Sequence, residues 1–191
     1  RAEMKLHPAR RGGGIKPEPR GNIRLWLGEA VAIKDPTCAR LARAAGSNVA
    51  IISPRDDQSV ATSVAMLLSI AKEAPGSMID VFDGTPSDAP EFGTLERIAG
   101  EHSIPARFTL YREIEQRMLE IAEDVAARAN DSGRPRRFLL VHQLQRYRAL
   151  RRNEDDYSFG ASDAPPSADK MLGGIVREGP VVGVHVVIAC D

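Results

Sequence analysis

The sequence has few cysteines, no net charge and no long hydrophobic run. Each of these features argues against one class of protein. Cys38 and Cys190 lie far apart and lack metal-type spacing, so we expect free thiols in a cytosolic setting rather than a disulfide framework. Lysine and arginine total 26, as do aspartate and glutamate, so net charge gives no reason to expect a nucleic-acid or membrane partner. No apolar run approaches the roughly 18–20 residues of a membrane span, and no signal peptide is recognisable. We expect no membrane contact by this segment, even if a parent protein is membrane-associated.

The composition is otherwise that of an ordinary globular domain. Hydrophobic residues make up 42% of the 191 residues and charged residues 27%, which suits one domain with a sizeable core. Residues 1–21 are rich in glycine, proline and arginine, so we expect a flexible basic linker there and the domain proper over 22–191. The chain starts at Arg1 and stops at Asp191 directly after an apolar stretch. This predicts a piece of a longer protein, truncated at its C-terminus.

Strand-like and helix-like segments alternate from residue 48 onward. The predicted strands are 49–52, 77–82, 106–110, 138–141 and 185–189, and the predicted helices are 57–73, 92–102, 112–130 and 170–177. Before them we expect a β-hairpin at 23–33 and a short helix at 38–45. Residues 144–168 are polar and predict a surface insertion. Continuously apolar strands between helices indicate an α/β fold, with a mainly parallel sheet and helices on both faces.

The predicted sheet places four polar stretches at one edge. In open α/β sheets, ligands bind at the carboxyl ends of the strands. That edge would bring together the turn 53–59, the turn at Asp83, His142-Gln143 and Cys190-Asp191. We therefore expect any binding site to lie along this rim.

Residues 48–70 have the frame of a phosphate-binding strand, loop and helix, but the loop chemistry is replaced. A working P-loop reads G-x-x-x-x-G-K-[ST], with glycines that expose backbone N–H groups and a lysine that reaches the phosphates. The turn in this chain reads Ser53, Pro54, Arg55, Asp56, Asp57, Gln58, Ser59, Val60. The glycines, the lysine and the magnesium-binding hydroxyl are all missing.

Over roughly residues 25–191, these stretches together resemble the motor domain of the FtsK/SpoIIIE family. Its members are ring-forming ATPases that pump DNA, and the related type VII secretion ATPases move polypeptides. The resemblance rests on the order and spacing of NVAIISPRDDQSVATSVAMLLSI at 48–70, MIDVFD at 78–83, FLLVHQ at 138–143 and GVHVVIA at 183–189. It implies a RecA-like P-loop NTPase fold preceded by a β-hairpin, with degenerate Walker motifs.

The resemblance also assigns each departure a position. Ser59 stands where the family has its phosphate-binding lysine, and Val60 where it has the Ser/Thr that binds magnesium. In the Walker B stretch, His142 replaces the aspartate and Gln143 the glutamate that activates water. Cys190-Asp191 occupies the sensor position, where the family has Thr-Gln.

The replacements predict weak phosphate chemistry at this turn. Pro54 offers no N–H, and the carboxylates of Asp56 and Asp57 would lie near the helix N-terminus, where phosphates would sit. We expect one of these aspartates to cap the helix, a contribution of about 1 kcal/mol. Gln143 can orient a water but is no general base at neutral pH, and His142 is a poor magnesium ligand.

The resulting functional hypothesis is a degenerate (pseudo-)ATPase module of a DNA or polypeptide translocase. It would act as a scaffold or regulatory domain that docks against other ATPase domains of the same or a related protein, within a ring oligomer, or against a translocated substrate. We expect no catalytic residue, no metal site and no cofactor.

Two alternatives stay open. In the first, the domain is an ATP-binding DNA translocase motor with altered motifs, in which Arg55 and backbone groups hold ATP and Mg²⁺. In the second, it is a nucleic-acid-binding module that uses the basic stretch 146–152, where Tyr147 lies among the charges. The arginines of that stretch are Arg146, Arg148, Arg151 and Arg152.

Overall fold

The computed structural model describes residues 21–28, 36–131, 133–151 and 166–191. At its centre lies a parallel five-stranded sheet with the strand order β3-β7-β6-β4-β5. Its strands are β3 (Val49–Ile52), β4 (Met78–Asp83), β5 (Ala106–Phe108), β6 (Arg137–His142) and β7 (Val184–Cys190). The helices are α1 (Asp56–Glu73), α2 (Thr94–Glu101), α3 (Ile114–Arg128) and α4 (Ala168–Glu178). This confirms the α/β fold expected from the sequence.

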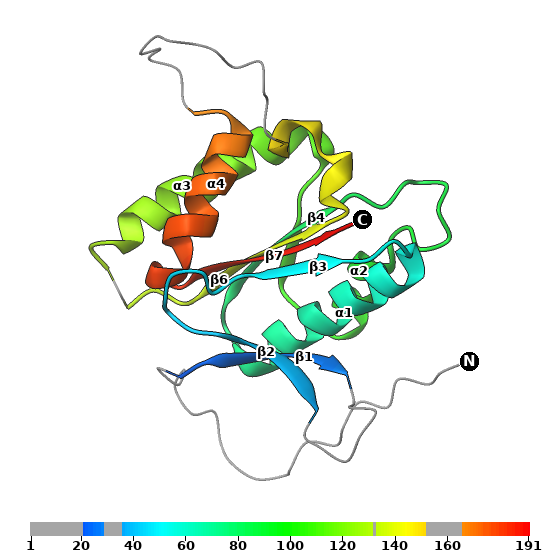
Figure 1. Cartoon of the computed structure of the whole chain (residues 1–191), viewed down its shortest axis with the longest axis horizontal. Coiled ribbons are helices and arrows are strands. Elements are labelled where there is room, and N and C mark those ends of the chain that lie inside the picture. Colours follow the sequence, from blue (N-terminus) through cyan, green and yellow to red (C-terminus); the bar gives the residue numbers. More distant parts are fainter. Residues whose placement is uncertain (1–20, 29–35, 132, 152–165) are drawn as a thin grey trace.

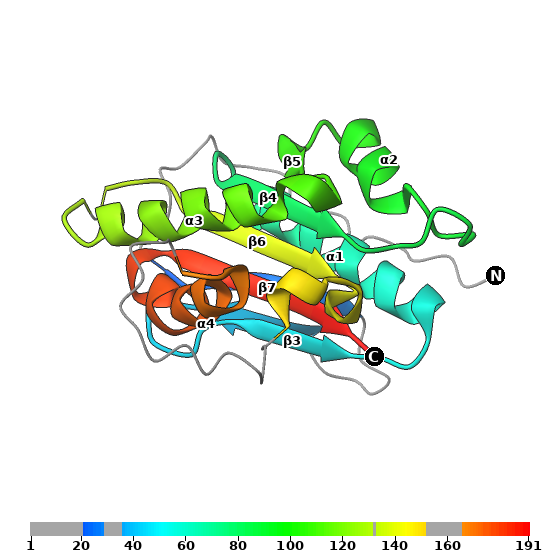
Figure 2. The same ribbon diagram turned by 90° about the horizontal axis from the view of Figure 1, so that it is seen from above.

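Helices cover both faces of the sheet, with α1 and α2 on one side and α3 and α4 on the other (Figures 1 and 2). Because neighbouring residues of a strand point to opposite faces, β6 supplies both cores. Phe138 and Leu140 pack in the core under α1, whereas Leu139 and Val141 pack in the core under α3 and α4. All six residues of β6 are buried, so its near-continuous apolar sequence follows from its place inside the sheet.

A separate antiparallel pair, β1 (Ile23–Gly28) and β2 (Thr37–Leu41), packs on the outer side of α1 (Figure 1). Leu25 and Leu41 are buried in the core that α1 shares with the sheet. Trp26 joins the pair to the helix, because its backbone N–H donates to Ser69 Oγ at 3.0 Å and its Nε1 donates to Glu73 Oε1 at 3.3 Å.

The β1–β2 pair corrects one sequence prediction. Residues 38–45 were expected to be helical, but 37–41 form the second strand, and the expected second strand at 31–33 lies outside the described residues. The local sequence lacks a clear strand pattern. Its extended form comes from pairing with β1, where Leu41 lies opposite Ile23 and Cys38 opposite Trp26.

The start of α1 corrects another prediction, the aspartate cap. The N-cap residue is Arg55, in an extended conformation and without a side-chain cap, and Asp56 and Asp57 lie in the first helical turn. Both carboxylates still face the positive end of the helix dipole. Each also has a side-chain partner, Gln143 for Asp56 and Arg55 for Asp57.

The polar stretch after β6 was expected to be a surface insertion, but its first part packs against the domain. Two short 3-10 turns, η2 (Leu144–Arg146) and η3 (Arg148–Leu150), follow β6 directly, and the side chains of Tyr147 and Leu150 are buried under α3 and α4. Residues 152–165 lie outside the described residues, including the acidic run at 154–156. No described helix is long and apolar enough to cross a membrane.

Buried charges join β4, β6 and α3 near the start of β6. Arg137 Nε donates to Asp80 Oδ2 at 2.7 Å, and Arg137 Nη1 donates to Asp124 Oδ2 at 3.2 Å. Asp124 also accepts from Arg128 at 2.8 Å and from Arg134 at 3.0 Å. Burial alone would raise the pKa of Asp124, but the hydrogen bonds and positive charges of these arginines outweigh it and lower that pKa.

A second buried group lies beside this network and includes Arg136 and His185. Arg136 Nη1 lies 3.2 Å from His185 Nε2, and Arg136 Nη2 donates to Gly21 O at 2.8 Å. The Nδ1 of His185 lies 2.8 Å from Ser47 O, so this nitrogen carries the proton and Nε2 accepts from Arg136. These contacts connect β6 and β7 with the residues at the start of β1 and before β3.

Candidate functional site

The structure brings the four predicted stretches together at the carboxyl ends of the strands, which we call the sheet rim: the turn 53–59, Asp83, His142-Gln143 and Cys190-Asp191. The register places Ile52 beside Cys190, Asp83 beside His142 and His142 beside Ala189. Ser53 N donates to Cys190 O at 2.9 Å, so the turn after β3 is joined directly to the end of β7.

Within the turn, Arg55 pairs with Asp57. Arg55 Nε and Nη2 donate to the two carboxylate oxygens of Asp57 at 3.1 and 2.7 Å, and both side chains are exposed. The hydrogen bond from Arg55 lowers the pKa of Asp57, which keeps the carboxylate charged. The Ser53 hydroxyl donates to Arg55 O at 3.2 Å. The positive charge of the turn is thus already matched by a carboxylate of the turn.

The two residues after Gln58 face the protein interior. Ser59 is 3% exposed and Val60 is 7% exposed. Val60 belongs to the core between α1 and the sheet. The lysine and magnesium-ligand positions that the resemblance assigns are therefore occupied by small buried side chains.

The end of β6 is tied to α1 by two side-chain contacts. His142, fully buried, places Nδ1 3.0 Å from Ser63 Oγ, and Gln143 Nε2 donates to Asp56 Oδ1 at 3.3 Å. Burial lowers the pKa of His142, against the charges of Asp83 and Asp56, so the neutral ring is favoured. Among the described residues, His142 Nε2 and Gln143 Oε1 are buried without a hydrogen-bond partner.

Gln143 and Gly84 show how closely the rim is packed. Gln143 has a positive φ of 55°, a conformation that non-glycine residues seldom adopt. Gly84 N donates to His142 O at 3.0 Å, and a Cβ at Gly84 would lie 2.9 Å from His142 O and 3.1 Å from the Tyr147 ring. Asp83 Oδ1 accepts from the Thr85 backbone and hydroxyl at 3.0 and 2.5 Å.

The rim carries no metal cluster within the part of the chain that the structure describes. Among the described residues, no three histidine, cysteine, aspartate or glutamate side chains gather in a way that would hold an ion. The Nδ1 of His142 is engaged by Ser63.

The comparisons with known proteins bear on the fold. No protein-family model matches the sequence, and no curated protein sequence matches it. Among solved structures, EccC from Thermomonospora curvata (ATPases 2 and 3, in complex with a signal sequence peptide) superposes with a TM-score of 0.58 at 10% identity. The match covers 90% of this chain and 29% of that one.

The fold is that of the EccC ATPase domains. The cytoplasmic domain of the Type VII Secretion ATPase EccC from the same organism superposes with a TM-score of 0.55 at 10% identity, over 88% of this chain and 18% of that one. The chain therefore spans less than a third of the length of either EccC structure. The α/β fold that the motif order predicted is thus shared with these ATPase structures.

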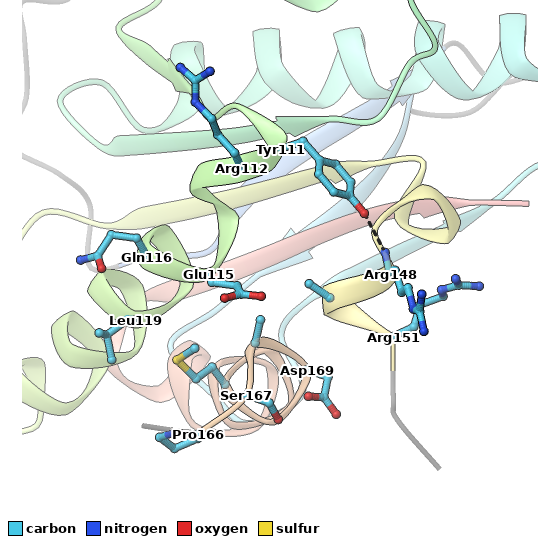
Figure 3. Close-up of a pocket in the computed structure, with 13 residues that line it drawn as sticks. Tyr111, Arg112, Glu115, Gln116, Leu119, Arg148, Arg151, Pro166, Ser167 and Asp169 are labelled. Carbon is cyan, nitrogen blue, oxygen red and sulfur yellow. Dashed lines mark hydrogen bonds between the residues drawn. The ribbon is translucent and has the colours of Figure 1, made fainter. Parts of the chain in front are cut away.

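The described arginines of the basic stretch do not all line one pocket. Arg148 and Arg151 line an open pocket of about 1050 Å³ between η3, α3 and α4 (Figure 3), whereas Arg146 is exposed elsewhere. Arg152 lies outside the described residues. The sequence suggested that Tyr147 lies among the charges, but its side chain is buried. Its ring stacks on that of Tyr111, with ring centres 5.5 Å apart.

Several residues that the structure places at the sheet rim or in the pocket were not predicted from the sequence. Ser63 and Asp56 contact His142 and Gln143 from α1, and nothing in the spacing of the sequence pointed to those pairs. Tyr111 and Glu115 line the pocket from the start of α3. The sequence signal available for this pocket was Tyr111 followed by Arg112, directly ahead of the amphipathic helix.

Proposed function

We propose that this domain is a pseudo-ATPase module of an FtsK/SpoIIIE-like translocase related to the type VII secretion ATPases. Its role is to dock against other ATPase domains or a translocated polypeptide and not to hydrolyse ATP. One similar EccC structure contains a signal sequence peptide, which favours a polypeptide over DNA as the transported partner. The observation that carries the proposal is the Arg55–Asp57 ion pair in the turn where a triphosphate would bind.

The physical argument concerns the charges at the start of α1. A triphosphate needs backbone N–H groups, a lysine and a magnesium ion. Here Pro54 offers no N–H, Asp56 and Asp57 add two carboxylates, and Arg55 is neutralised by Asp57. Each missing charge-assisted contact costs on the order of 1.5–3 kcal/mol. The residues of the turn therefore fit Mg-ATP poorly.

A similar argument speaks against ATP hydrolysis. The side chain of Gln143 donates to Asp56, and an amide is no general base. His142 is buried and bonded to Ser63, and its imidazole ring has no oxygen with which to bind magnesium. We expect no phosphate release above background from the purified chain.

Calorimetric titration of the whole chain with Mg-ATP tests the proposal. We expect no binding heat up to millimolar nucleotide. The matched variant restores the loop with Ser53→Gly, Gln58→Gly, Ser59→Lys and Val60→Thr, and it should gain measurable affinity if the frame is right. Micromolar binding by the unmodified chain would overturn the proposal and favour the ATP-binding motor, with Arg55→Ala as the next variant.

A further inference from the structure

The open pocket beside α3 and α4 is a second candidate binding site, separate from the turn after β3. Its walls come from η1 (Tyr111–Glu113), α3, η3 and the first turn of α4. Figure 3 shows Arg148 and Arg151 together on one side, Glu115 facing the space between α3 and α4, and Arg112 pointing away. At about 1050 Å³ and open to solvent, the pocket is large enough for a short stretch of polypeptide.

The pocket offers charges of both signs. The Arg148 and Arg151 side chains are exposed and form no ion pair with a described residue. A guanidinium group suits a carboxylate, because it offers paired N–H donors. Glu115 is also exposed and unpaired within the described part of the chain, and the pocket is bordered by Asp169 as well.

This mixture of charges distinguishes between ligands. A phosphate backbone would meet the arginines, but it would also meet the carboxylate of Glu115, which lines the same pocket and repels phosphate. A peptide can place one acidic side chain on the arginines and keep uncharged or basic groups near Glu115. Charge complementarity therefore favours a peptide over a nucleic acid.

An apolar recess adjoins the charged pocket. A smaller cavity of about 230 Å³ shares Tyr111 and Glu115 with the larger one and adds Ile114 and Tyr147 to its walls. Tyr111 is 61% exposed, and its ring is fixed against Tyr147 and by the contact of its hydroxyl with Arg148 N at 3.4 Å. An exposed aromatic ring held in one orientation gives an apolar side chain a rigid surface to pack on.

We propose that this pocket binds a peptide segment of a partner protein in which an acidic side chain lies next to an apolar one. The acidic group would contact Arg148 and Arg151, and the apolar side chain would enter the recess beside Tyr111 and Ala149. The inference rests on the proposed docking role. It does not depend on nucleotide, so its failure and a positive ATP titration would be separate results.

Selection of random peptides displayed on phage against the whole chain tests the proposal. The chain with Arg148→Ala and Arg151→Ala serves for counter-selection. We expect enriched sequences that place Asp or Glu beside Leu, Ile or Phe. A synthetic peptide of the enriched sequence should bind the double variant at least roughly tenfold more weakly, because each charge-assisted contact is worth about a factor of ten.

Arg146→Ala is the matched control, because Arg146 belongs to the same basic stretch but does not line the pocket. Its affinity for the peptide should equal that of the unmodified chain. With Arg148→Glu and Arg151→Glu, a peptide whose acidic residue is replaced by lysine should bind better than the original. No enrichment, or binding unchanged in both arginine double variants, would overturn the proposal.

Single-stranded and duplex DNA carrying a fluorescent label provide the competing probe. Under the proposal DNA does not bind at physiological salt. DNA binding that falls steeply with salt and weakens equally in Arg146→Ala, Arg148→Ala and Arg151→Ala would overturn the peptide proposal in favour of a nucleic-acid module.

Discussion

The buried polar side chains at the two ends of the central sheet differ in charge and in their number of partners. Where β6 begins, Arg136 and Arg137 are buried charges with several partners each, including Asp80, Asp124 and His185. At the sheet rim the buried polar groups are neutral, and His142 and Gln143 have one side-chain partner each. The first end should therefore contribute more to stability, and substitutions at the rim should cost less.

The largest effect should come from Asp80→Ala, which leaves Arg137 and Arg117 without their shared carboxylate. Asp80 is 3% exposed, and removing one partner of a buried ion pair costs about 3–5 kcal/mol. Urea unfolding measures the change. The control, Glu101→Ala, breaks the exposed Arg97–Glu101 pair and should cost less than about 1 kcal/mol. Equal losses in the two variants would remove the distinction between buried and exposed pairs.

The next effect is the pH dependence that His185 produces. Burial, together with the charges of Arg136 and Arg43, lowers the pKa of His185 from 6.5 to about 4, against the hydrogen bond to Ser47. Between these values the unfolded chain binds a proton that the folded chain does not. The free energy of unfolding should therefore fall as pH drops from 6.5 to 4, by roughly 3 kcal/mol in total.

Urea unfolding at several pH values in the unmodified chain and in His185→Gln measures this contribution. The variant should be less stable at pH 7 but should show a smaller slope between pH 6.5 and 4. Some slope will remain, because burial also lowers the pKa of His142. Parallel pH profiles in the two proteins would show that His185 is not the source.

Gly84→Ala probes the packing of the sheet rim. The added methyl group would lie 2.9 Å from His142 O and 3.0 Å from Gln143 O, so the two strand ends must move apart. We expect a loss of about 1–3 kcal/mol by thermal or urea unfolding. Gly100→Ala in α2 is the matched control, because nothing lies within 4 Å of the new Cβ, and it should be neutral or stabilising. An unchanged free energy of unfolding in Gly84→Ala would mean that the strand ends at the rim can move apart at little cost.

The smallest effect should come from Ser63→Ala, which removes the single side-chain partner of His142. Leaving a buried ring nitrogen unsatisfied costs about 1–3 kcal/mol, and we expect the lower part of that range because the ring is neutral. Ser69→Ala, which removes the acceptor for Trp26 N in the same helix, is a suitable comparison. A loss as large as that of Asp80→Ala would contradict the ranking of the two ends.

The core elements of the fold were predictable because their patterns are local. The apolar run 49–52 and the strongly periodic 112–130 gave β3 and α3 with small shifts of their ends. The rim followed from parallel topology, which brings strand ends together whatever their residues. Strand β2 was missed because its extended form depends on pairing with β1, a contact that the local sequence does not encode.

The partners of the rim residues were not predictable from the sequence. Ser63 lies 79 residues from His142 along the chain, so only the packing of α1 on β6 brings them together. The sequence predicted part of the pocket. The basic stretch pointed to Arg148 and Arg151, but Glu115 and Tyr111 lie beside them only because the folded chain places α3 there. Charge complementarity across three elements is a property of the folded chain.

Trp26 gives the chain a built-in optical reporter. It is the one tryptophan of the sequence, and it lies where the β1–β2 pair meets α1, with the Arg24 guanidinium 5.0 Å from its ring and Glu73 bonded to its indole nitrogen. Its emission therefore records whether the antiparallel pair is seated on the helix, whereas circular dichroism is dominated by the helices and the larger sheet. Comparing the two signals in one denaturation series shows whether the pair detaches before the main domain unfolds.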